Sequence, residues 1–222
     1  MGYFYETHAH TRTGFPCGKN TGDELARYFK SLDYTGMIVT DHILRSEADA
    51  VEGKWEQRVE QLCTGYEAAK AEGNVIGLDV FQGWEYGEGW NHFLVYGLGR
   101  DWLMANPDCL RWDPVEYLHR VRQAGAFVVQ AHPFREGVTS YLLIPQETDG
   151  VEVLSASRSD EANRHAEDYC ASYGKIRHAG TDIHWVNYPR LAGVEGNRRF
   201  ADIHDYIEGL KAGEYRLFDR RM

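Results

Sequence analysis

The stretch DPVEYLHRVRQAGAFVVQAHP, residues 113–133, joins a helical pattern directly to a strand pattern. Its first part predicts a helix, because Asp113 at the start and Gly125 at the end are typical of helix termini. Its second part, AFVVQAHP (126–133), predicts a short buried strand that reaches a histidine. A helix followed at once by a buried strand is the unit from which parallel α/β sheets are built.

The same alternation runs through the rest of the chain. Further strands are predicted at 3–9, 35–42, 74–86, 91–98, 150–156 and 176–182. Further helices are predicted at 21–32, in a long segment ending near Gly73, from about 160 to 173, and at 201–213. Six or seven such units favour a barrel of parallel strands over an open sheet. We therefore expect an α/β barrel that forms a single domain over residues 1–222.

Composition narrows the classes of function. The 222 residues carry a net charge of −10, which argues against a broad electrostatic grip on nucleic acid or on an anionic membrane. The N-terminus has no signal-peptide pattern, and no apolar run reaches the length of a membrane span. The four cysteines form no CxxC pair, so we expect a reducing, cytoplasmic setting rather than a disulfide framework.

Polar residues gather where the predicted strands end. In a parallel barrel, chemistry takes place at the C-terminal ends of the strands. Most of the predicted strands carry a histidine or an acid at an end: His8, His10, Asp41, His42, Glu85, His92, His132, Asp182 and His184. His92 stands at the start of its strand, so it reaches the shared end only through a short antiparallel reversal in GEGW (87–90). A core histidine is the alternative for His92.

The spacing of these residues suits metal binding. Residues two apart on a strand point to the same face, so His8 and His10 can reach one ion, and Asp182 and His184 can address the same cluster. Glu85, an acid on an otherwise apolar strand, is the best candidate to bridge two ions. Six histidines and two acids have room for two or three divalent ions of Zn, Mn or Fe. The alternative, ordinary polar residues at strand ends, does not explain why the whole set converges.

Five motifs in order carry a family resemblance. THAHT (7–11), VTDH (39–42), GWEY followed by NHFLVYGL (83–98), QAHPFR (130–135) and GTDIHW (180–185) resemble the PHP (polymerase and histidinol phosphatase) domain, most closely its stand-alone metal-dependent phosphoesterases. The resemblance runs from residue 3 to about 195. It implies a distorted (β/α)7 TIM-like barrel whose di- or trinuclear metal centre hydrolyses phosphate esters.

The resemblance also implies how the ions are shared. His8, His10, Glu85 and Asp182 would hold the first ion. Glu85 would bridge to a second ion, which His92 and His132 would also bind. His42 and His184 would hold a third ion.

The chain departs from the family pattern at the third ion. Many relatives place a histidine or aspartate five or six residues after the second histidine of the first motif, where this chain has Phe15 and Pro16. Cys17 comes next, and its thiolate could replace that ligand at a zinc site. A free cysteine in a loop is the equal alternative.

The reaction implied is attack of a metal-activated hydroxide on phosphorus, as in histidinol phosphatases. Cationic side chains should complete the pocket. Arg135 is the first choice, as a catalytic and substrate-binding residue. Arg12, Lys19 and Arg190 are further substrate-binding candidates. Asp41 is a catalytic candidate that would orient a ligand or the water, with a simple helix N-cap as its alternative.

The expected partner is a small-molecule phosphate monoester. The main alternative is a nuclease-type phosphodiesterase acting on nucleotides or DNA ends, against which the net charge counts. A metal-dependent amide hydrolase is weakened because no lysine stands at a strand end. A barrel that has lost its metals ranks last, since every main ligand is present.

Overall fold

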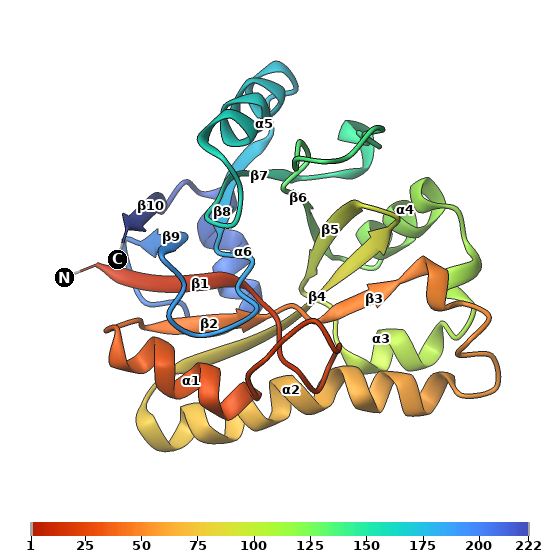
Figure 1. Cartoon of the computed structure of the whole chain (residues 1–222), viewed down its shortest axis with the longest axis horizontal. Coiled ribbons are helices and arrows are strands. Elements are labelled where there is room, and N and C mark those ends of the chain that lie inside the picture. The colour runs from red at the N-terminus through yellow and green to blue at the C-terminus, as the bar shows by residue number, and fades with distance from the viewer. Residues whose placement is uncertain (1, 222) are drawn as a thin grey trace.

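The computed structural model describes residues 2–221, and its centre is one curved sheet (Figure 1). Within those residues the strands are β1 (Tyr3–Ala9), β2 (Gly36–Val39), β3 (His42–Leu44), β4 (Asp79–Glu88), β5 (Asn91–Tyr96), β6 (Phe127–Ala131), β7 (Gly150–Ser155), β8 (Ile176–Gly180), β9 (Arg190–Gly196) and β10 (Tyr215–Arg221). Their spatial order is β10-β9-β1-β2-β4-β5-β6-β7-β8, and β3 continues the line of β2 beside β4.

Helices pack against this sheet, and the last of them buries Tyr206, Ile207 and Leu210 among the side chains inside the barrel. They are α1 (Gly22–Ser31), α2 (Trp55–Ile76), α3 (Arg100–Ala105), α4 (Pro114–Gln123), α5 (Asp160–Ser172) and α6 (Ile203–Lys211). Figure 1 shows α1 and α2 side by side along β2 and β4. The predicted N-cap of α4 is confirmed, because Asp113 accepts hydrogen bonds from the N–H groups of Val115 and Glu116 at 3.0 and 3.1 Å.

The sheet curls until its two sides meet between β1 and the end of β8. His10 N–H donates to the carbonyl of Ile183 at 3.0 Å, and Ile183 N–H donates to the carbonyl of His8 at 3.1 Å. The hydroxyl of Thr7 donates to the carbonyl of Ala179. The predicted α/β fold, a distorted TIM-like barrel, is therefore confirmed. Its distortion lies in the antiparallel strands, since β5 runs against β4 and β6, and β9 runs against β1.

Some boundaries differ from the predictions. The strand predicted at 35–42 is two strands, β2 and β3, interrupted at Thr40 and Asp41. The strand predicted to begin at 74 begins at Asp79, because α2 continues to Ile76 and ends at Gly77 with a left-handed φ of 73°. Strands β9 and β10 and helix α3 were not predicted.

Aromatic and aliphatic side chains fill the barrel below the strand ends that carry histidines. Tyr5, Leu94, Tyr96, Phe127 and Tyr206 are all fully or almost fully buried there. Among residues 2–221, no helix combines the length and the apolar character that crossing a bilayer requires. The inner part of the barrel is thus a packed core, and the eight predicted metal ligands lie beyond it, at the other end.

Candidate metal-binding site

All eight predicted metal ligands lie at one end of the barrel. They come from the ends of β1, β6 and β8, the start of β3, and the paired strands β4 and β5: His8, His10, His42, Glu85, His92, His132, Asp182 and His184. The reversal predicted through residues 87–90 occurs, with His92 opposite Gly87 on β4 and opposite Ala131 on β6. The antiparallel β5 therefore brings its first residues, rather than its last, to the polar end.

Glu85 lies at the centre of the cluster and is completely buried. Its carboxylate oxygens lie 2.8–3.4 Å from ring nitrogens of five histidines: His8, His10, His42, His92 and His132. Burial alone would raise the pKa of Glu85, but His92, His8 and His42 hold it well below its usual range. Glu85 is therefore an anion enclosed by imidazoles.

Asp182 is a second buried anion, and it approaches the same ring nitrogens of His8 and His10 as Glu85 does. Its Oδ1 lies 3.3 Å from His10 Nε2 and 3.6 Å from His8 Nε2. Its Oδ2 accepts hydrogen bonds from the guanidinium of Arg158 at 2.8 Å and from the hydroxyl of Ser157 at 2.9 Å. Burial would raise the pKa of Asp182, yet His8 and His10 keep it well below its usual range. Its backbone has φ 57°, in the left-handed region.

Several buried polar atoms of this cluster make no hydrogen bond within residues 2–221, although some of them lie in the ion-pair contacts described above. They are His8 Nε2, His10 Nδ1 and Nε2, His42 Nδ1, His132 Nδ1 and Glu85 Oε2. Leaving such atoms unpaired in a protein interior costs free energy, so they are rare unless something binds them. Imidazole nitrogens facing carboxylate oxygens form the donor set that divalent transition metals take. The residues therefore fit a metal centre.

Four overlapping groups have ligand atoms that all lie within 4.8 Å of one another. The groups are His8–His10–Glu85, His8–His132–Asp182, His42–Glu85–His92, and His10–Cys17–His42–His184. The last one brings in Cys17 from the loop after β1. Burial raises the pKa of the Cys17 thiol, but the neighbouring His184 and His42 outweigh burial and lower it from 9.0 to about 7.

Two buried acids that the sequence analysis missed support the histidines. Glu152 lies on β7, and its Oε1 is 3.0 Å from His8 Nδ1. Its Oε2 accepts a hydrogen bond from the backbone N–H of His132 at 3.0 Å. Glu6 accepts the N–H groups of His8 and Thr181 at 2.9 Å. A carboxylate on the second nitrogen of a metal-binding histidine fixes the direction of the first nitrogen. An acid inside the apolar run GVEVL (150–154) was the available signal for Glu152.

Asp41 does not face the cluster. It is buried, and its oxygens accept hydrogen bonds from the backbone N–H and the hydroxyl of Thr11 at 2.5 and 2.6 Å. Burial raises its pKa to about 7. Asp41 thus ties the loop after β1 to the loop after β2. It caps no helix, and its contacts are those of a residue that shapes the site's edge.

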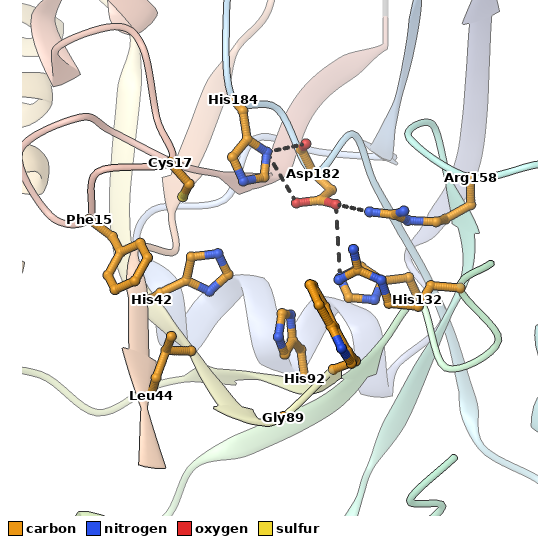
Figure 2. Close-up of a pocket in the computed structure, with 12 residues that line it drawn as sticks. Phe15, Cys17, His42, Leu44, Gly89, His92, His132, Arg158, Asp182 and His184 are labelled. Atoms are coloured by element: carbon orange, nitrogen blue, oxygen red, sulfur yellow. Dashed lines mark hydrogen bonds and ion pairs between the residues drawn. The ribbon is translucent and has the colours of Figure 1, made fainter. Parts of the chain in front are cut away.

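A cavity of about 490 Å³ opens over the cluster. Figure 2 shows His42, His92, His132 and His184 around it, with Phe15 and Leu44 on one side and Arg158 on the other. Two further lining residues, Arg135 and Trp90, stack with the guanidinium carbon 4.9 Å from the ring centroid. The Nε atoms of Arg135 and Arg158 are buried without a hydrogen-bond partner among the described residues. The wall of the cavity therefore includes two guanidinium groups.

The other predicted cations lie elsewhere. Arg12 and Lys19 are exposed in the loop after β1 and do not line the cavity. Arg190 lies on β9, where its guanidinium pairs with Asp160 and Asp219 at 2.8 and 2.7 Å. Arg158 also lines the cavity. It was not predicted, because the strand that it follows, β7, ends without a histidine.

No family model matches this sequence, and no curated protein matches it. Solved structures do. A two-domain protein of Bacteroides vulgatus containing a predicted PHP-like metal-dependent phosphoesterase matches with a TM-score of 0.70 at 14% identity, over 98% of this chain and 65% of that one.

Two other solved structures match with lower TM-scores. A protein of Bifidobacterium adolescentis, provisionally described as a metal-dependent phosphoesterase, has a TM-score of 0.58 at 16% identity, over 94% of this chain and 96% of that one. An amidohydrolase of Chromobacterium violaceum, with bound sulfate and no metal, has a TM-score of 0.55 at 16% identity, over 83% of this chain and 88% of that one.

At such low identity these likenesses concern the fold. The chain has the fold of PHP-like metal-dependent phosphoesterases, which confirms the fold that the family resemblance implied. The chain spans 65% of the length of the Bacteroides protein.

Proposed function

We propose that this chain is a metal-dependent phosphoesterase that hydrolyses a small phosphate monoester. The observation that carries the proposal is the buried Glu85, enclosed by five histidines beneath a cavity that also contains two arginines. A cluster of imidazoles and carboxylates binds metal cations, which activate water for hydrolysis. Arginines bind phosphate oxygens, so the same cavity can also hold the phosphate group of the substrate.

The donor set supports two or three divalent ions. His8 and His10, which both contact Glu85 and Asp182, would hold one ion with these two acids. Glu85 would share a second ion with His92 and His132, which it also contacts. His42 and His184 would hold a third. When bound, such ions lower the pKa of a water molecule and neutralise charge that develops on a phosphoryl group.

The side chains of the chain itself have the remaining tasks. Arg135 and Arg158 line the cavity and would bind the phosphoryl oxygens through their guanidinium groups. Asp182 positions Arg158 by accepting its hydrogen bond at 2.8 Å. Phe15, Leu44 and Trp90 form an apolar wall that would contact the leaving group and keep water away from it.

The test is a metal count and an activity assay on one sample. The protein, purified without a metal-chelating tag, should contain about two or three ions of Zn, Mn or Fe per chain and release phosphate from members of a phosphomonoester panel. Chelation should abolish release, and the added metal should restore it. A chain that binds no metal and releases no phosphate after metal addition would contradict the proposal.

Replacing Arg135 with methionine should raise KM for the phosphomonoester about 10- to 100-fold, because a charge-assisted hydrogen bond contributes about 1.5–3 kcal/mol. The metal content should not change. Arg120→Met is the matched control, since Arg120 also stacks on a tryptophan, at 4.2 Å from the ring of Trp112, but lies outside the cavity. An unchanged KM in Arg135→Met would remove Arg135 from substrate binding.

A further inference from the structure

The loop between β1 and α1 holds Cys17 against the histidines by a set of backbone contacts. Arg12 N–H donates to the carbonyl of Asn20 at 2.9 Å, and Lys19 N–H donates to the carbonyl of His184 at 2.7 Å. Gly18 permits this path, because a Cβ there would lie only 2.5 Å from the carbonyl carbon of Thr11. The position of Cys17 is therefore set by the fold of the loop.

Cys17 shares its surroundings with three histidines from other strand ends. The thiol and one ring nitrogen each of His10, His42 and His184 all lie within 4.8 Å of one another. Figure 2 shows Cys17, His42 and His184 facing the same space. His10 is completely buried, and its Nδ1 has no hydrogen-bond partner among the described residues. That nitrogen is an observation independent of the cysteine, and it indicates a ligand.

We propose that Cys17 supplies a thiolate ligand to the third metal ion, together with His42 and His184. This inference rests on the proposed function, since it concerns the same metal centre. On binding, the thiol loses its proton to solvent and the sulfur donates an electron pair to the cation, with no change of oxidation state. Two imidazoles and one thiolate leave a fourth position open, as in zinc sites that also bind water or substrate.

The proposal has a consequence for metal choice. A thiolate is a softer ligand than a carboxylate, so the third position should favour zinc or cobalt over magnesium or calcium. The positions around Glu85 and Asp182 offer imidazole and the harder carboxylate, so their preference for zinc or cobalt should be weaker. The ring of Phe15 packs edge-on against His42, with centroids 5.2 Å apart, and lines the cavity together with Cys17. The three positions should therefore differ in metal preference.

Cobalt(II) gives a direct test, because only a bound thiolate adds a thiolate-to-cobalt charge-transfer band in the near ultraviolet. The full chain, freed of metal by a chelator, is titrated with Co²⁺ and assayed for phosphate release. We expect the band in the native chain. Cys17→Ser should lose it together with about one ion per chain, while the visible cobalt bands of the other positions persist and show that the fold is intact.

Two further variants sharpen the test. Cys17→His should regain the third ion without the charge-transfer band. Cys63→Ser should keep the band, because the Cys63 thiol accepts a hydrogen bond from Gln82 on the face of α2. Cobalt binding and phosphate release without the band, or a band that survives in Cys17→Ser, would overturn the thiolate assignment and leave the proposed function standing. Absence of both cobalt binding and phosphate release would overturn both.

Discussion

Glu85→Gln should lose at least two bound ions per chain and at least about 10³-fold in kcat/KM, which corresponds to about 4 kcal/mol of transition-state stabilisation. Glutamine keeps the shape of the side chain but removes the anion that five histidines surround. The remaining imidazoles then face one another without a shared counter-charge, so a cation that needs two anionic donors is released. Metal analysis and phosphate release on the same preparation measure both effects.

Glu88→Gln is the matched control for that result. Glu88 lies on the same strand, but its carboxylate is partly exposed and pairs with Arg45 at 3.2 Å, outside the cavity. Exposed ion pairs of this kind contribute little to stability, so metal content and activity should remain at native levels. A Glu85→Gln protein that folds, keeps its ions and turns over substrate would show that Glu85 is not the shared ligand.

The convergence of the eight histidines and acids could be predicted from the sequence. Parallel strands have their C-terminal ends at one edge, and residues two apart share a face, so His8, His10, Asp182 and His184 had to lie near one another once the barrel was assumed. The placing of His92 required one more step, the reversal between β4 and β5. It succeeded because GEGW is too short to form anything but a turn.

Arg135 was predicted and lines the cavity, but the other cations could not be predicted in the same way. Arg190 and Arg158 are both long side chains near strand ends, and which of them points into the cavity depends on ion pairs between distant segments. Arg190 is held by Asp160 and Asp219, whereas Arg158 is drawn inward by Asp182. Strand β10, which carries Asp219, was not predicted. The ion pair between Asp219 and Arg190, which holds Arg190 outside the cavity, could therefore not be predicted either.

Asp182→Asn should lower kcat/KM by about 10²-fold or more, equivalent to about 3 kcal/mol, and release one ion per chain. The substitution is suited to the backbone, because asparagine tolerates the left-handed φ of 57° as well as aspartate does. It removes the negative charge that faces His8 and His10 and that draws Arg158 into the cavity. We therefore expect two separable effects, a lost ion and a raised KM.

The double variant Asp182→Asn with Arg158→Met separates these two effects. If Asp182 positions Arg158 as well as binding an ion, the KM changes of the two single variants should not add, because both remove the same phosphate contact. The loss of the ion should appear only where Asp182 is changed. Asp219→Asn is the control, because Asp219 pairs with Arg190 outside the cavity. It should leave both KM and the number of bound ions unchanged. Fully additive KM changes would mean that Arg158 reaches the phosphate without help from Asp182, and Asp182 would then be a metal ligand alone.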